Sequence, residues 1–107
     1  MKAEQKLYET DPEFMERFEH FAYEEVVKEE GQILDEKTRY LAILATLLGC
    51  QGLDVFKATL PEALDAGLSP VMIKETVYQA VDYLGIGRMY PFLGAVNEVL
   101  EERGAQL

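Results

Sequence analysis

The chain has 107 residues, of which 49% are hydrophobic and 28% are charged, a balance typical of a soluble globular protein. This length predicts one domain over residues 1–107. The formal net charge of −10 repels phosphate backbones and anionic membranes, so we expect neither nucleic acid nor a membrane as a partner.

Cysteine usage and the first residues indicate the compartment. Cys50 is the only cysteine, so the chain cannot form an intrachain disulfide. The opening stretch MKAEQKLYET lacks the apolar segment of a signal peptide, and no stretch is long enough to cross a bilayer. We therefore expect a cytoplasmic protein.

Apolar residues recur with helical spacing between the glycines, which predicts an all-α fold of about five helices without strands. The first predicted helix spans 11–30, with Asp11 as N-cap and Pro12 at its first position. The second spans 35–48, with Asp35 as N-cap. Its sequence YLAILATLL is apolar nearly all round, so we expect it at the centre of the core.

The third predicted helix spans 53–66 and ends at Gly67, which is suited to a left-handed C-terminal cap. Pro61 lies inside this helix and should kink it or split off its last turn. The residues GCQG precede it, and Cys50 there is either a reactive thiol or a small apolar residue at a helix junction.

Two more helices complete the prediction. The fourth begins after Ser69 as N-cap, with Pro70 at its first position, and ends before Gly85. The fifth spans 88–103, and Pro91 fits its first turn, where no intrahelical hydrogen bond is lost.

One acidic residue of the first predicted helix falls on its apolar side. At 100° per residue, Glu25 lies within the stripe formed by Phe14, Met15, Phe18, Phe21 and Ala22. The only histidine, His20, falls on the opposite side with Glu16 and Glu24. Their spacing is that of metal ligands along a helix, but an exposed polar face explains the same residues, and we expect no metal.

One basic residue of the third predicted helix likewise falls on the apolar side of its helix. Lys57 falls in the stripe of Leu53, Phe56, Leu60 and Leu64, and Cys50 would project on nearly the same side if the helix extended back to it. A carboxylate and an ammonium on apolar faces are costly unless paired, so Glu25 and Lys57 suggest a pair or a shared pocket suited to proton transfer. Alternatively, Lys57 reaches solvent from the stripe edge, and Glu25 lies where the stripe already faces solvent.

Further candidates lie on the second and fourth predicted helices. Met72, Thr76, Gln79 and Tyr83 form a semi-polar line that borders a pocket, borders a subunit interface or packs in the ordinary way. Arg39 is a candidate for binding a substrate carboxylate, or for pairing with Glu36 three residues earlier.

Four segments carry a resemblance to a known family: L-D-x-K-T-R, A-L-x-A-G-L-S-P-x-x-I-K-E, V-Y-Q-A-V-x-Y-x-G and the closing N-E-V-L. In their order and spacing, over about residues 11–103, they resemble the carboxymuconolactone decarboxylase family. The resemblance implies an all-helical, alkylhydroperoxidase-D-like fold, a homotrimer or homohexamer with sites near subunit interfaces, and no cofactor.

The resemblance implies two activities. One is decarboxylation of a muconolactone carboxylate, and the other is a thiol peroxidase cycle that uses Cys-x-x-Cys followed by a histidine, with a glutamate as proton relay. Cys50 matches the first cysteine, whereas the second falls on Leu53 and the histidine of both branches falls on Lys57. A single chain therefore lacks the resolving thiol.

The leading hypothesis is a lyase that acts on a small carboxylated or lactone metabolite by proton transfer or decarboxylation. Glu25 would be the base or relay, and Lys57 would neutralise the developing charge or return the proton. Gln79 and Tyr83 would orient the substrate, while Arg39 would hold its carboxylate. Cys50 would line the cleft.

Two alternatives remain from the sequence. The first is a peroxiredoxin-type activity in which Cys50 alone is oxidised and an external thiol resolves the sulfenic acid; the dipole of the third helix would activate this thiol if it sat at the helix N-terminus. The second is a non-enzymatic oligomeric binding protein on the same fold.

Overall fold

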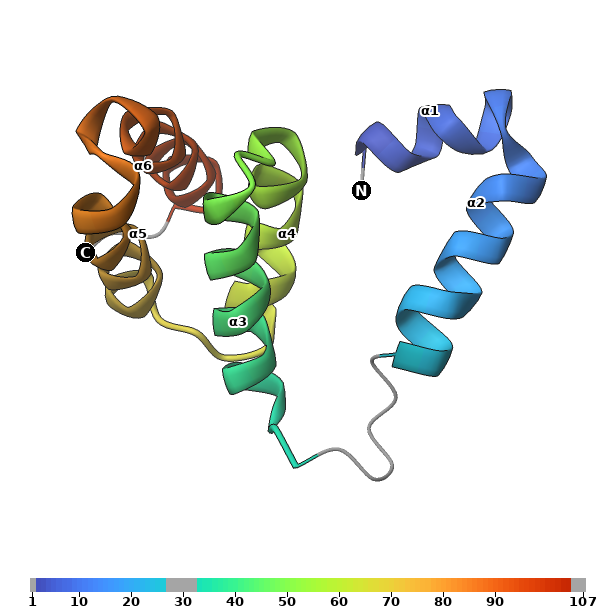
Figure 1. The fold of residues 1–107 in the computed structure, drawn as a ribbon, viewed down its shortest axis with the longest axis horizontal. Coiled ribbons are helices and arrows are strands. Elements are labelled where there is room, and N and C mark those ends of the chain that lie inside the picture. Colours follow the sequence, from blue (N-terminus) through green and yellow to red (C-terminus); the bar gives the residue numbers. More distant parts are fainter. Residues whose placement is uncertain (1, 27–32, 105–107) are drawn as a thin grey trace. The chain divides into compact units, whose positions relative to one another are not determined.

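The computed structural model describes residues 2–26 and 33–104, and its regular elements are helices throughout these ranges (Figure 1). In chain order they are α1 (Lys2–Thr10), α2 (Pro12–Glu19), the π-helix η1 (His20–Val26), α3 (Glu36–Gly49), α4 (Leu53–Asp65), α5 (Pro70–Leu84) and α6 (Ile86–Glu102). The predicted all-α class is confirmed. Of the helices in these ranges, none combines the length and the apolar character needed to span a bilayer.

The chain divides into two compact units, Met1–Asp35 and Glu36–Leu107. The first contains α1, α2 and η1, and the second contains α3 to α6. The expectation of one domain over 1–107 stays a prediction.

The first unit contains a helix that the sequence pattern did not predict, α1. Asp11 separates it from α2, and Pro12 takes the first position of α2 as expected. The Asp11 side chain does not cap the helix amides; it accepts a hydrogen bond of 2.8 Å from the Thr10 hydroxyl instead. Met15 is the residue of α2 that is buried.

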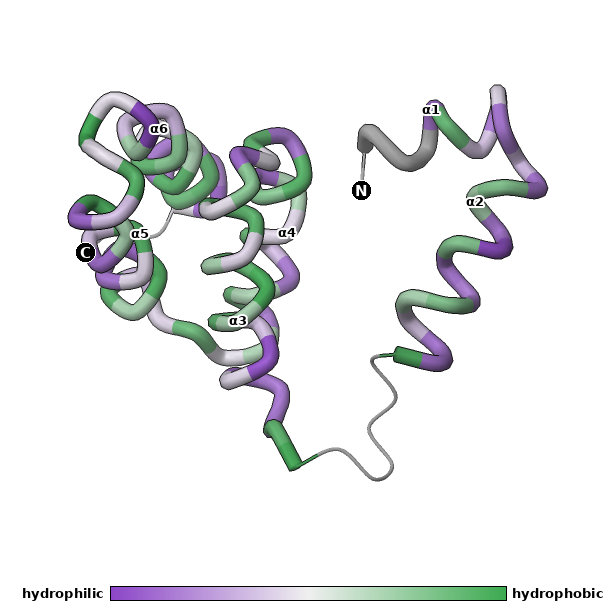
Figure 2. The backbone as a smooth tube through the Cα atoms, viewed as in Figure 1, coloured by the Kyte–Doolittle hydropathy of each residue, from purple (hydrophilic) through white to green (hydrophobic). Residues whose placement is uncertain are grey.

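The first predicted helix, 11–30, consists of two kinds of helix in the structure. After Glu19 the α-helix gives way to η1, in which backbone hydrogen bonds join residues five apart instead of four. Hydrophobic and hydrophilic residues alternate along α2 (Figure 2). The predicted end at Glu30 lies outside the described residues.

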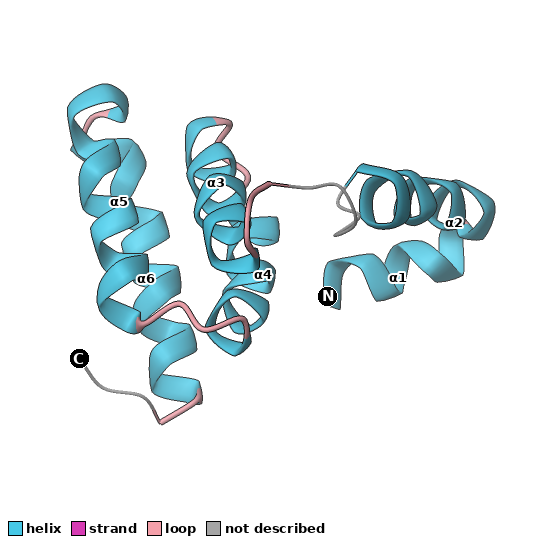
Figure 3. Ribbon diagram, turned by 90° about the horizontal axis from the view of Figure 1, so that it is seen from below, coloured by secondary structure: helices cyan, strands magenta, loops and turns pink. Residues whose placement is uncertain are grey.

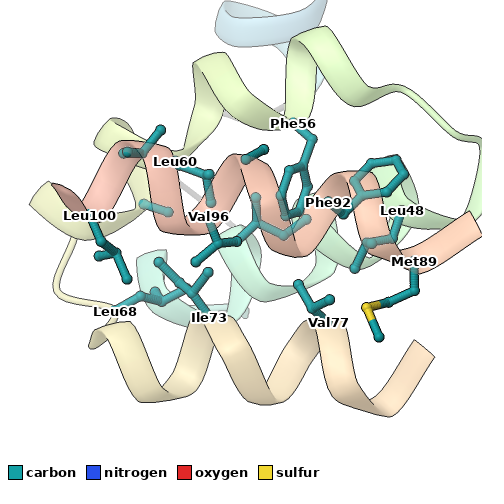
Figure 4. Close-up of a cluster of buried hydrophobic side chains, with 14 residues drawn as sticks. Leu48, Phe56, Leu60, Leu68, Ile73, Val77, Met89, Phe92, Val96 and Leu100 are labelled. Atoms are coloured by element: carbon teal, nitrogen blue, oxygen red, sulfur yellow. The ribbon is translucent and has the colours of Figure 1, made fainter. Parts of the chain in front are cut away.

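The second unit is a four-helix arrangement in which α3 and α6 each pack against both α4 and α5 (Figure 3). Its centre is an apolar cluster drawn from all four helices (Figure 4). The Phe56 and Phe92 rings meet edge to face there, with centroids 5.0 Å apart. The other fully buried large side chains are Leu44, Leu48, Leu60, Ile73, Val77 and Val96.

The expectation that 35–48 forms the centre of the core is corrected by the burial pattern. Leu44 and Leu48 are the buried residues of α3, whereas Ala42 and Ala45 are exposed. The alanines make α3 apolar on every side, but their side chains are too small to form a core on every side. The helix is therefore one wall of the core.

Two similar turns end α3 and α4. At the end of α4, the Gly67 amide donates to the Leu64 carbonyl and the Leu68 amide to the Ala63 carbonyl. Gly67 has φ +107°, the left-handed cap predicted for it, and Leu68 is buried in the core.

At the end of α3 the same bonding places Gln51, rather than a glycine, in the left-handed conformation at φ +62°. The Gly52 amide donates to the Leu47 carbonyl, and the Gln51 side-chain amide donates to the Leu48 carbonyl at 2.9 Å. This side-chain bond offsets part of the strain of the Gln51 backbone.

The caps and prolines of the last helices match the prediction in part. The Ser69 hydroxyl accepts a hydrogen bond from the Met72 amide at 3.1 Å, which confirms the N-cap. Pro61 does not split off the last turn of α4, because the helix continues to Asp65. Pro91 is not in the first turn, because α6 begins at Ile86.

The turn at Gly67 generates a stability prediction. Gly67→Ala should lower the free energy of unfolding by about 1–2 kcal/mol, because φ is positive. In addition, its new Cβ would lie 2.7 Å from the Lys37 side chain. Gly94→Ala is the matched control: it lies inside α6 with open space around it, and should raise stability by about 0.5–1 kcal/mol. Urea unfolding followed by circular dichroism measures both, and equal effects would contradict the predicted cap.

Candidate functional site

Lys57 lies on α4 and contacts α6. Its Nζ donates to Oε2 of Glu98, and its side chain is 43% exposed. The hydrogen bond to Glu98 and the charge of that carboxylate raise the pKa of Lys57, and the charges of Glu102 and Asp54 add to the effect. Lys57 is thus an ammonium at neutral pH, held by charge rather than buried among apolar residues.

A second ion pair lies between the same two helices. The Arg103 guanidinium donates to Oδ1 of Asp65 at 2.7 Å. Asp65 is the last residue of α4, and Arg103 caps the C-terminal end of α6. The α4–α6 seam, defined by the pairs Lys57–Glu98 and Asp65–Arg103, is therefore charged on its outer side.

Glu25 lies on η1 beside the histidine that the helical wheel placed on the opposite side. Glu25 Oε1 is 3.4 Å from Nε2 of His20, and Glu24 Oε2 is 2.5 Å from Nδ1 of the same ring. The wheel assumed α-helical pitch, but in a π-helix residues five apart lie about one turn apart, so Glu25 rotates toward His20. Glu25 is exposed.

These residues border an open polar hollow of about 720 Å³ in the first unit. It is lined by Tyr8, Glu13, Glu16, Arg17, Glu19, His20, Phe21, Glu24 and Glu25. Within the described residues, however, no three His, Cys, Asp or Glu side chains are arranged to hold a metal ion.

Glu25 and Lys57 each have an identified partner within their own unit: Glu25 contacts His20, and Lys57 contacts Glu98. Because the two residues belong to different units, a contact between them stays a prediction.

Cys50 directly follows the last residue of α3 and does not begin α4. Its amide donates to the Thr46 carbonyl, and α4 begins three residues later at Leu53 with Gly52 as its N-cap. Its thiol is exposed and lies 3.7 Å from the Leu47 carbonyl oxygen. The condition for activation by the α4 dipole, a place at the N-terminus of that helix, is therefore not met.

A groove of about 440 Å³ runs between α3 and α5. We call it the α3–α5 groove; it is lined by Leu41, Ala45, Leu48, Gly49, Thr76, Gln79, Ala80, Tyr83 and Leu84. Gln79 and Tyr83 are exposed on it, so their polar groups are available to a ligand. The semi-polar line of the fourth predicted helix thus borders a groove, except for Met72, which packs against the core.

Arg39 lies half-buried on α3, next to Tyr40. Burial is the main cause that raises the pKa of the Tyr40 hydroxyl, with the carboxylates of Glu62 and Glu36 adding to it and Arg39 opposing it. Arg39 does not line the α3–α5 groove. Its role in binding a substrate carboxylate stays a prediction.

Glu98 is the residue of this region that the sequence reasoning missed. It lies in the closing N-E-V-L segment, which carries part of the family resemblance but gives no sign in the sequence that its glutamate pairs with Lys57. A charged residue in a shared segment, set among the buried residues Val96, Val99 and Leu100, was the available signal.

The comparison with family models confirms the resemblance. The model described as the carboxymuconolactone decarboxylase family matches residues 12–98, from the start of α2 to Glu98 of α6. A search of curated proteins and a search of solved structures each gave no significant match. The helices described above agree with the all-α, alkylhydroperoxidase-D-like fold of that family. The chain, matched over most of its length, belongs to the carboxymuconolactone decarboxylase family.

Proposed function

We propose that the protein is a lyase that acts on a small carboxylated or lactone metabolite. The observation that carries this proposal is the α3–α5 groove, which has the size of a small-molecule site and presents the exposed Gln79 and Tyr83 side chains. Family membership supports the reaction type.

The chemistry needs a proton donor. When the bond to the carboxylate breaks, CO₂ leaves and the electron pair stays on carbon, conjugated with a neighbouring carbonyl. That carbon then takes up a proton. Lys57 is held protonated by Glu98, so it is suited to stabilise this charge and then to give the proton, which it regains from water or through Glu25.

Lys57 does not line the groove: it lies on the α4–α6 seam, whereas the groove is lined by α3 and α5. In our proposal, the Lys57 that acts on a groove-bound substrate comes from a neighbouring copy of the chain. We propose a homotrimer or homohexamer in which this happens, in line with the interfacial sites that the family resemblance implies.

Complementation between variants tests the shared site. Lys57→Ala and Ala45→Phe, which fills the groove, should each reduce CO₂ release from a panel of carboxylated lactones by about 100-fold or more. Oligomers assembled from both variants should regain activity, because some sites receive an intact groove and an intact lysine. Ala42→Phe, on the exposed part of α3 outside the groove, is the control that should stay active. A mixture no more active than its components would contradict the proposal.

The role of Glu25 is tested by a pair of neighbouring substitutions. Glu25→Gln should slow turnover, because it removes the proposed proton relay to Lys57, whereas Glu24→Gln should not. Both residues contact His20, so the pair separates proton transfer from a general effect on that histidine. Equal kcat values for the two variants would remove Glu25 from the mechanism.

The raised pKa of Lys57 gives a pH dependence. A group whose pKa is raised stays protonated to higher pH, so a rate that needs the Lys57 ammonium should fall only on the alkaline side of the ordinary lysine range. Glu98→Gln removes the main cause and should move this fall to lower pH. The Lys57 side-chain NMR signals, followed against pH, should shift in the same direction, and an unchanged titration would contradict the assigned cause.

The exposure of Cys50 favours a second candidate function, thiol-dependent peroxide reduction. The thiolate sulfur would attack the peroxide oxygen, forming a sulfenic acid and releasing water or an alcohol, and an external thiol would restore the cysteine. Treatment with a stoichiometric hydroperoxide should add one oxygen to the intact mass, and Cys50→Ser should abolish this gain. A Cys50 that stays unmodified while free cysteine is oxidised would rule the candidate out.

A further inference from the structure

The lining of the α3–α5 groove is uncharged. Its nine residues are five aliphatic side chains, one glycine and three neutral polar side chains, in a chain where 28% of the residues are charged. A carboxylate placed in this groove would lose water without gaining a cation, which is strongly unfavourable. The groove therefore selects against charge.

The polar groups of the groove are few and lie on one helix. The Thr76 hydroxyl already donates to the Met72 carbonyl at 2.9 Å, so it offers a ligand only an acceptor. Gln79 and Tyr83 follow on the next turns of α5, four residues apart and hence on one side. Together they offer a neutral donor and acceptor pair at one edge.

The hollow itself comes from small residues on α3. Ala45 and Gly49 lie one turn apart and leave space above Leu48, which is 1% exposed and belongs to the core. A volume of about 440 Å³ is within the range of small-molecule sites and accommodates a ring or a short acyl chain.

We propose that the α3–α5 groove binds an uncharged apolar body that carries one carbonyl or hydroxyl group, hydrogen-bonded by Gln79 and Tyr83, and that it excludes carboxylates. This rests on the proposed function, in which the groove is the substrate site. The uncharged groove restricts the proposed substrate to a compound whose single carboxylate stays outside the groove. Lactones that carry several carboxylates are therefore disfavoured as substrates.

A matched pair of probes tests the selection against charge. We use 2-naphthol and 2-naphthoate, which share the same rings, and follow the NMR signals of the full-length labelled chain at neutral pH. Naphthol should bind with shifts at the Gln79 side-chain amide and the Ala45 methyl. Naphthoate has no neutral polar group besides its carboxylate, so its rings can enter the groove only with the carboxylate at Gln79 and Tyr83 or with no hydrogen bond there. It should therefore bind at least about tenfold more weakly. Equal affinities would overturn the proposal.

Three variants locate the binding. Ala45→Phe should abolish naphthol binding, and Ala42→Phe on the same helix should leave it unchanged. Gln79→Leu, at an exposed position that tolerates substitution, should weaken binding about threefold to tenfold through the lost hydrogen bond. If neither probe binds and Ala45→Phe changes the sedimentation coefficient, the groove is a contact between proteins and the proposal fails.

These experiments distinguish a failure of the groove assignment from a failure of the lyase proposal. Naphthol binding without turnover of any carboxylated lactone leaves the groove assignment intact and removes the lyase, in favour of a binding protein. Turnover of lactones with several carboxylates, together with no difference between the two probes, removes the groove assignment and leaves the lyase.

Discussion

The edge-to-face packing of Phe56 against Phe92 joins α4 to α6 at the centre of the second unit, and the positions of the candidate sites follow from it. Because the cluster around these rings fills the interior, chemistry is confined to the outer seams between helices. One seam is closed by ion pairs between α4 and α6. The opposite pair of helices, α3 and α5, leaves a hollow because small residues replace larger ones where they face each other.

Charge and apolar surface are thereby separated in this molecule. Lys57 is surrounded by Asp54, Glu98 and Glu102, so the potential around its ammonium is set by more negative than positive groups. An anionic substrate must compete with Glu98 for it, whereas the groove presents no charge at all. The proposed substrate, with an apolar body and an acidic end, would satisfy both environments.

Local signals were sufficient for part of the fold, and tertiary contacts decided the rest. Ser69 and Gly67 were predictable as caps because their roles depend on a few adjacent residues. Helix α1 was not, because its nine residues are mostly polar and a helix this short is marginal on its own. The partner of Lys57 could not be predicted for a different reason: Glu98 lies 41 residues later, and sequence spacing contains no measure of which helices meet. The helix face assigned to Glu25 was wrong for a third reason, since one change of helical pitch after Glu19 rotated its side chain away from the assumed face.

That change of pitch also bears on how the length of related sequences varies. A segment that repeats every five residues holds more residues per turn than an α-helix, so removing one residue between His20 and Val26 restores ordinary winding with little change of direction. The same deletion within α4 would turn every later side chain by about 100° and carry Leu60 and Ala63 out of the core. A single-residue deletion should therefore disturb this chain less at η1 than in the helices that enclose the two phenylalanines.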